Sequence, residues 1–110
     1  MEELKIYQKS YDCLLRLYQT TKHFPKSEKF TLAAELKTAM LGFLRLIFKA
    51  GKSANKKSIL YTADVELEII RMQIRAAKDM KIMSVHKYEI LARDLSEIGK
   101  MLGGWIKMLK

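Results

Sequence analysis

Basic side chains in this 110-residue chain are spaced in a way that suits phosphate binding. The stretch between Glu35 and Asp64 holds six bases and no acidic residue. Two trios of bases repeat the interval i, i+4, i+7, which places three side chains on one side of a helix. With a net charge of +9, such stripes favour a polyanionic partner over a small-molecule active site. The trios are Arg45, Lys49 and Lys52, and Arg71, Arg75 and Lys78.

The candidate nucleic-acid-binding residues are these two trios together with Lys56 and Lys57, which follow the first trio in the next turn. A solvated helix face is the better explanation of any single one of these bases, because charged side chains are mostly exposed. The cluster as a whole favours binding, since no acid compensates it in the acid-free stretch. Glu68 precedes Arg71 by three residues, so we expect an exposed ion pair between them.

The residues that catalysis or metal binding would need are not grouped. His23 and His86 stand alone, without the paired histidine, cysteine or carboxylate spacing of a metal site. Cys13 has no base beside it and is expected to pack in the core. Gly51-Lys52-Ser53 lacks the upstream glycine and the preceding strand of a phosphate loop. We therefore expect no enzyme activity, no catalytic residue, no bound metal and no cofactor.

Hydrophobic periodicity predicts four helices and no strand. The first carries an a/d stripe that we expect to face the core, and Pro25 ends it. The second is capped by Ser27 and runs to about Ala50, where Gly51 stops it. In the third, apolar residues recur every three or four positions over 60–77. Ser84 caps the fourth, which extends to residue 109. The first stripe consists of Leu4, Tyr7, Tyr11, Leu14 and Tyr18.

Four helices of about five turns with short connections predict one all-α domain over residues 1–110. Its architecture is an antiparallel up-down-up-down four-helix bundle. The composition, with 49% hydrophobic and 30% charged residues, is that of a folded soluble protein. A single cysteine and the absence of a secretory-signal layout indicate a cytoplasmic location. The most apolar stretch is too short to span a bilayer, and no membrane partner is expected.

The second predicted helix is apolar on more than one face, and a bundle buries only a stripe of each helix. Either this helix makes a wide contact with the third, or it carries a subunit interface. The apolar residues in question are Met40, Leu41, Phe43, Leu44, Leu46, Ile47 and Phe48. Similarly, Gly99 and Gly103 either allow the close approach of another helix or belong to a frayed C-terminal end.

Three segments, in this order, resemble a known family. They are Phe24-Pro-Lys-Ser-Glu-Lys-Phe30, the stretch from Val65-Glu-Leu-Glu to Ile74-Arg-Ala-Ala-Lys-Asp-Met80, and Glu97-Ile-Gly-Lys-Met-Leu-Gly-Gly-Trp-Ile106. Together they resemble the accessory variability determinant proteins of diversity-generating retroelements. That family lies within a superfamily that includes four-helix-bundle proteins encoded in ribosomal-RNA intervening sequences. The intervening-sequence branch usually has a Ser-Ile-Pro segment where this chain reads Lys37-Thr-Ala-Met-Leu-Gly-Phe-Leu44, which favours the retroelement branch.

The resemblance implies a function that periodicity alone does not. It implies a homopentameric ring of basic bundles that binds the retroelement reverse transcriptase and its template RNA, with DNA as a further candidate partner. In that role the protein assists mutagenic, adenine-directed copying, and the polymerase performs the chemistry. The alternative is a structural or interaction protein of the intervening-sequence type with no enzymatic role. A third reading, docking on an anionic membrane surface, would need a helix with an exposed apolar face.

Overall fold

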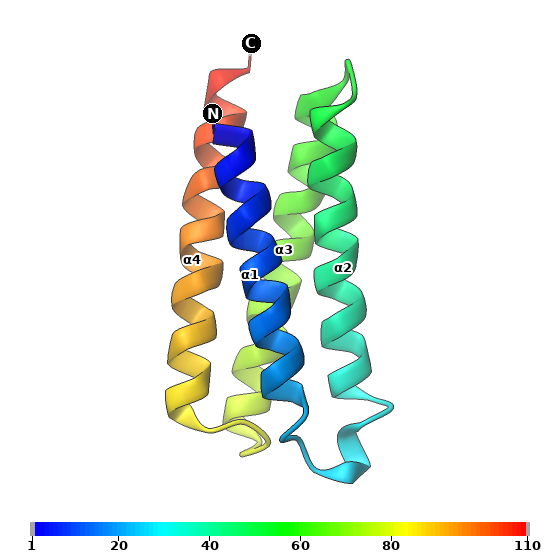
Figure 1. The fold of residues 1–110 in the computed structure, drawn as a ribbon, viewed down its shortest axis with the longest axis vertical. Helices are drawn as coiled ribbons and strands as arrows, with labels where there is room; N and C mark the ends of the chain where they lie inside the picture. The colour runs from blue at the N-terminus through cyan, green and yellow to red at the C-terminus, as the bar shows by residue number, and fades with distance from the viewer. Residues whose placement is uncertain (1, 110) are drawn as a thin grey trace.

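Four long helices run side by side along the length of the molecule, as the sequence predicts (Figure 1). The computed structural model describes residues 2–109, with side chains from Glu3 onward. The described residues form no strand, which confirms the all-α class. The elements are α1 (Glu2–Thr21), a short 3₁₀ helix η1 (Lys26–Glu28), α2 (Leu32–Gly51), α3 (Lys56–Asp79) and α4 (Val85–Met108).

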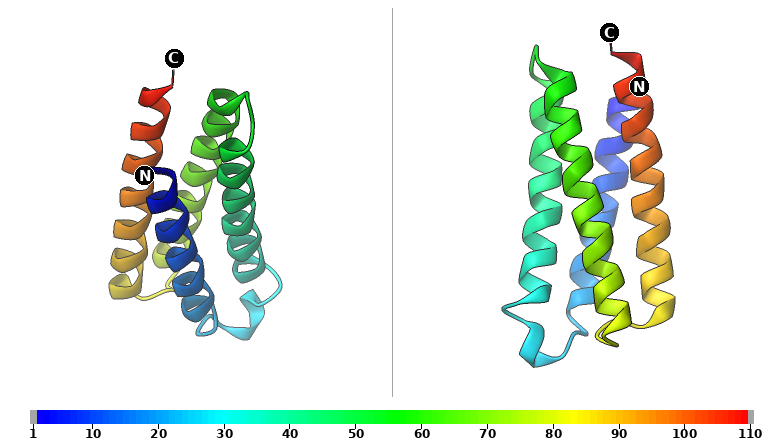
Figure 2. Two further views of the ribbon diagram at one scale, coloured as in Figure 1. Left: turned by 45° about the horizontal axis from the view of Figure 1, so that its top comes forward. Right: turned by 180° about the vertical axis from the view of Figure 1, so that it is seen from behind.

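The helices alternate in direction and occupy the corners of a four-sided bundle (Figure 2). Each packs on its neighbours in the order α1, α2, α3, α4 and back to α1. Over the described residues, α1 and α3 form one diagonal pair and α2 and α4 the other, and the backbones of neither pair approach one another closely. The α2–α3 turn therefore lies at the same end of the bundle as the start of α1 and the end of α4 (Figure 1).

The second helix is the centre of the core. Its contact with α3 is the most extensive of the four. Leu41 and Leu46 are half-buried at its edges, and Phe48 alone of the predicted surplus is exposed. The wide contact with the neighbouring helices therefore covers the apolar surplus within one chain. The buried residues of α2 are Ala33, Leu36, Met40, Phe43, Leu44, Ile47 and Ala50.

The core-facing register of α1 differs from the predicted one. Leu4, Tyr11 and Tyr18 of the predicted stripe are exposed, with 61%, 51% and 38% of their surface accessible. Both the real and the predicted stripe repeat at steps of three and four, so periodicity could not tell them apart. The real stripe is the less apolar one because it includes two hydroxyl side chains. It consists of Ile6, Ser10, Cys13, Leu17 and Thr20.

Tyr7 joins three helices near the end where the α2–α3 turn lies. Its ring stacks on Phe48 of α2 with 4.4 Å between ring centroids, and it meets Trp105 of α4 edge-on at 6.3 Å. A Cβ atom on Gly51 would collide with the Tyr7 hydroxyl, so the helix end at that position requires glycine. Glycine at this position therefore makes room for the α1 side chain.

Two of the expected helix boundaries are informative. Ser84 caps α4, because its hydroxyl oxygen accepts a hydrogen bond from the backbone N–H of Lys87 at 3.2 Å. Ser27 does not cap α2, since it lies in η1 and α2 begins only at Leu32.

Gly99 lies against α3, where a Cβ would touch Leu67, and α4 stays helical to Met108. The interpretation of Gly99 and Gly103 as a frayed end is therefore wrong.

Candidate nucleic-acid interface

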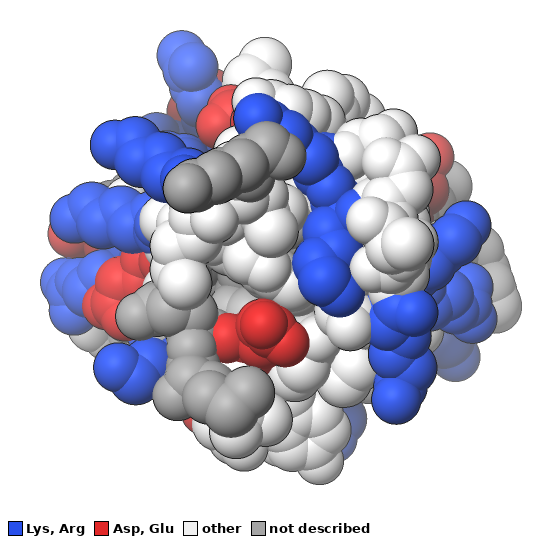
Figure 3. Space-filling view, turned by 90° about the horizontal axis from the view of Figure 1, so that it is seen from above, with Lys and Arg blue, Asp and Glu red and all other residues white. Residues whose placement is uncertain are grey.

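One group of predicted bases lies at the end of the bundle formed by the α2–α3 turn. Arg45 and Lys49 project from the last two turns of α2, Lys52 follows directly after that helix, and Lys57 lies in the first turn of α3. All four side chains are exposed. Figure 3 looks onto this end and shows lysine and arginine side chains around much of its rim. We call these four residues the end cluster.

The end cluster is not neutralised by the protein itself. Among the side chains from Glu3 to Leu109, no carboxylate lies within ion-pair distance of any of its four bases. Glu35 and Glu66 line the same shallow hollow as Arg45 without forming an ion pair with it. Uncompensated charges of one sign on one surface are the electrostatic footprint of a polyanion site.

Lys56 has a structural role that the sequence did not reveal. Its ammonium group donates hydrogen bonds to the backbone carbonyls of Ala50, Gly51 and Ser53 at 3.2, 3.0 and 2.9 Å. These carbonyls belong to the C-terminal end of α2 and the turn after it, where helix groups lack partners and the dipole is negative. Lys56 therefore closes the α2–α3 turn, and its three N–H donors are used by the backbone and not free for a ligand.

Replacing Lys56 with methionine is expected to destabilise the fold by about 1–2 kcal/mol, because charge-assisted bonds to three carbonyls are lost. Urea unfolding followed by circular dichroism measures this. Lys57→Met is the matched control, since the Lys57 side chain is exposed and should change stability by no more than about 0.5 kcal/mol. Equal effects of the two substitutions would contradict the capping role.

The second predicted trio lies elsewhere and is locally paired. Arg71 approaches Glu68 at 3.5 Å, the ion pair that the sequence predicted. Arg75 and Lys78 both approach Asp79, at 3.9 and 3.6 Å. The Lys78 ammonium also lies 4.4 Å from the ring centroid of Tyr88 on α4. This trio therefore faces the α3–α4 side of the bundle with much of its charge already balanced.

The structure does not bring the two trios together. Arg71 follows the start of α3 by fifteen residues, which corresponds to about 22 Å along the helix axis. Arg45 and Lys49 lie on α2 instead, close to the turn. The predicted site is thus two separate basic patches, and only the end cluster lacks acidic partners.

Further basic residues surround the α1–α2 connection at the opposite end, and the helical spacing rule missed them. They line a cavity of about 360 Å³ whose aromatic walls are Tyr18 and Phe24. The Lys37 ammonium lies 5.2 Å from the Tyr18 ring centroid. No acidic side chain lines this cavity among the described residues. The bases are Lys22, Lys26, Lys29 and Lys37.

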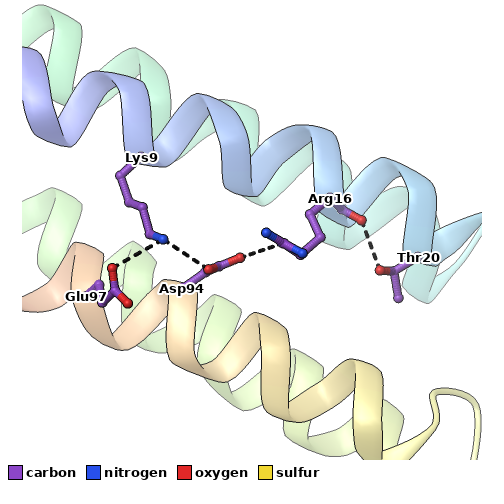
Figure 4. Close-up of polar contacts among 5 residues, drawn as sticks. All are labelled: Lys9, Arg16, Thr20, Asp94 and Glu97. Carbon is purple, nitrogen blue, oxygen red and sulfur yellow. Dashed lines mark hydrogen bonds and ion pairs between the residues drawn. The ribbon is translucent and has the colours of Figure 1, made fainter.

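An ion-pair network fastens α1 to α4 (Figure 4). The buried Asp94 carboxylate accepts from Lys9 at 3.1 Å and from Arg16 at 2.8 Å, and Lys9 also reaches Glu97 at 3.2 Å. Burial alone would lower the pKa of Lys9, but its hydrogen bonds to Asp94 and Glu97 hold that pKa above its ordinary value. Lys9 and Arg16 therefore stabilise the contact between α1 and α4.

Cys13 is a core residue, with 2% of its surface accessible. Burial, and then the charge of Asp94, raises the pKa of its thiol to about 12. A thiol that stays neutral and covered does not act as a nucleophile at neutral pH.

The residues described contain no group of three His, Cys, Asp or Glu side chains that could hold a metal ion. Nor is any of the four described helices long and apolar enough to cross a membrane.

The raised pKa of Cys13 predicts a loss of stability at alkaline pH. The unfolded chain releases the thiol proton near pH 8.5–9 and the folded chain only near pH 12, so the stabilisation is complete below about pH 8.5 and declines as pH rises toward 12. Each pH unit in this window costs about 1.4 kcal/mol. Urea midpoints at pH 7, 9 and 10.5 should fall less in Cys13→Ala than in the wild type. Parallel declines would contradict the assignment.

These features define the class of protein: a small basic antiparallel four-helix bundle. Within that class the chain belongs to the bAvd-like family, whose profile matches residues 4–109. No curated protein matches the sequence. A solved structure from Bacteroides thetaiotaomicron, a protein of unknown function from the S23 ribosomal protein family, has the same fold. It is 19% identical, superimposes with a TM-score of 0.88, and the match covers 97% of this chain and 99% of that one.

Proposed function

We propose that this protein is a nucleic-acid-binding accessory subunit of a retroelement reverse transcriptase, which holds the template RNA during mutagenic copying. The observation that carries the proposal is the end cluster of Arg45, Lys49, Lys52 and Lys57, four exposed bases without a described acidic partner. Membership of the bAvd-like family supports the accessory role. The nucleic acid would be held mainly through its phosphates.

Phosphate binding determines what such a subunit can contribute. Each phosphate contact releases condensed counterions, so affinity falls steeply with salt and depends little on sequence. The accessory subunit would therefore position a strand without reading it, and the polymerase would form the new bonds. The locally paired trio of Arg71, Arg75 and Lys78 would contribute less to affinity than the end cluster, because Glu68 and Asp79 already lie within reach.

Assembly as a homopentamer belongs to the same proposal. Apolar side chains of α1 and α3 are exposed on different sides of the bundle, and exposed apolar faces of this kind are typical of protein contacts. Five copies of a chain of charge +9 would carry +45 in total. A ring would thus multiply the end cluster fivefold around one axis and strengthen binding to a long RNA through multivalency.

The test is reconstituted copying. A diversity-generating retroelement reverse transcriptase and its template RNA are incubated with or without this protein, and the complementary DNA is sequenced. We expect more full-length product and adenine-directed substitutions only when the protein is present, and loss of both with Arg45→Gln/Lys49→Gln/Lys52→Gln. Copying that is unaffected by the protein, together with no RNA affinity at low salt, would leave the structural-protein alternative.

A further inference from the structure

The cavity at the α1–α2 connection, which we call the lysine cavity, gathers positive charge around a small volume. Four lysines line about 360 Å³, which lies within the range of small-molecule sites. The cavity lies at the opposite end of the bundle from the end cluster (Figure 1). Its charged and aromatic residues are Lys22, Lys26, Lys29 and Lys37, together with Tyr18 and Phe24.

The charge of the lysine cavity is not balanced by the chain itself. Among the described side chains, no carboxylate lies within ion-pair distance of any of the four lysines. Glu28 is the only acid between Asp12 and Glu35 in the sequence, and it does not line the cavity. Its carboxylate instead accepts a hydrogen bond from the Thr31 hydroxyl at 2.7 Å. Because neighbouring ammonium groups repel one another, a multiply charged anion would stabilise this arrangement.

The positive end of α2 adds to this charge. Ala33 is the second residue of α2 and lines the cavity, so the first turn of that helix borders it. Within the described part of the chain, the N-cap residue Thr31 gives this turn no side-chain hydrogen bond. The backbone N–H groups of an uncapped first turn and the helix dipole both favour a bound anion. The cavity thus combines ammonium side chains with a helix N-terminus.

Tyr18 and Phe24 give the lysine cavity an aromatic side that a bare phosphate would not need. Phe24 is buried, whereas 38% of the surface of Tyr18 remains accessible. The Lys37 ammonium lies 5.2 Å from the centroid of the Tyr18 ring, so a cation and an accessible ring are adjacent. Stacking a base on an aromatic ring beside basic groups that hold its phosphates is a general mode of nucleotide recognition.

We infer that the lysine cavity binds the 5′-triphosphate group of a nucleotide, with the phosphates among the lysines and the base against Tyr18. A triphosphate carries about four negative charges, which matches the four lysines better than the single charge of a backbone phosphodiester. Because no described carboxylate lines the cavity, the ammonium groups take the place that Mg²⁺ usually has beside phosphates. The triphosphate comes either from a free nucleotide or from the first nucleotide of an RNA transcript. The site does not depend on the proposed role in copying, since free nucleotide tests it without RNA.

The experiment measures the binding of ATP, tripolyphosphate and adenosine to the whole protein by isothermal titration calorimetry, with EDTA present. We expect ATP and tripolyphosphate to bind with a Kd below about 1 mM and adenosine not to bind, because the phosphates supply most of the affinity. Excess Mg²⁺ should weaken the binding of ATP, since the metal competes with the lysines for the same oxygens. No binding of ATP in EDTA, or binding only with Mg²⁺, would overturn the inference.

Two double variants locate the site. Lys26→Gln/Lys29→Gln should lower the affinity for ATP by about tenfold or more, because two charged hydrogen-bond donors are lost. Both side chains are exposed, so the bundle should fold as before, and circular dichroism checks this. The matched control is Lys100→Gln/Lys107→Gln on α4, whose side chains are also exposed. It should change the affinity by about twofold or less at about 0.1 M salt, where distant charges are screened. Equal losses in the two variants would contradict the assignment to the cavity.

Tyr18→Leu distinguishes a nucleotide site from a general polyanion site. It should weaken the binding of ATP by about fivefold or more and change that of tripolyphosphate by about twofold or less, because only the base stacks on the ring. If both ligands lose affinity equally, or neither does, the base does not contact Tyr18 and the nucleotide assignment is wrong.

The source of the triphosphate is determined with a short RNA that carries either a 5′-triphosphate or a 5′-hydroxyl group. Tighter binding of the triphosphorylated RNA, lost in Lys26→Gln/Lys29→Gln, assigns the cavity to the end of a transcript. Equal binding of the two RNAs, together with binding of ATP, assigns it to the free nucleotide.

Discussion

Replacing Arg45, Lys49 and Lys52 together with glutamine is expected to weaken binding to a structured RNA by about two to three orders of magnitude at 0.1 M salt. Each phosphate contact changes the slope of log affinity against log salt by about 0.9, so three lost contacts lower affinity by about 2.7 log units at that salt concentration. Glutamine keeps the length and helix propensity of these side chains. All three are exposed, so stability should change little. Fluorescence anisotropy with a labelled RNA measures the affinity.

The matched control for this triple variant is Arg71→Gln/Arg75→Gln/Lys78→Gln, which removes the same number of charges. These bases already have Glu68 and Asp79 within reach, so we expect a decrease of about tenfold or less. If the α3 variant loses more affinity than the α2 variant, the interface lies on the α3–α4 side and the assignment to the end cluster is wrong.

The second large effect concerns stability. Phe43→Ala is expected to cost about 3–5 kcal/mol, because it removes a fully buried ring from the helix that centres the core. Domains of this size are stable by only about 5–15 kcal/mol, so the variant should be partly unfolded at 37 °C. Thermal and urea unfolding followed by circular dichroism measure the loss.

Phe30→Ala is the matched control for Phe43→Ala. Phe30 belongs to the Phe-Pro-Lys segment that resembles the family, but 84% of its surface is accessible. It should change the free energy of unfolding by about 0.5 kcal/mol or less. Comparable losses for the two phenylalanines would mean that α2 is not the centre of the core.

Helix number and most helix boundaries were predictable because they depend on local chemistry. Ser84 marks the start of α4 through capping, which the sequence records directly, and α2 ends at Gly51, close to the predicted position. The core-facing side of α1 was not predictable. Its exposed stripe is richer in leucine and tyrosine than its buried one, which contains Ser10 and Thr20. Hydrophobicity predicted the wrong core-facing side because the exposed side of α1 is also apolar, and is more apolar than the side that packs in the core.

The candidate site was predictable in part for a related reason. Charge spacing identifies which bases share a helix side, and the end cluster follows from it. It does not identify a base whose partners are backbone carbonyls, such as Lys56. Nor does it pair Lys9 with Asp94, which are 85 positions apart in the sequence. Such pairings arise from tertiary contacts, so the number of bases left for a ligand can be counted only in the folded chain.

The most direct test of the nucleic-acid role is the affinity of the wild-type protein for a structured RNA, titrated from 50 to 400 mM salt. We expect tight binding at low salt and a linear fall of log affinity with log salt, with a slope of about −3 or steeper. That slope corresponds to at least three phosphate contacts, the number that Arg45, Lys49 and Lys52 can supply. No binding at 50 mM salt, or binding that does not change with salt, would contradict the account.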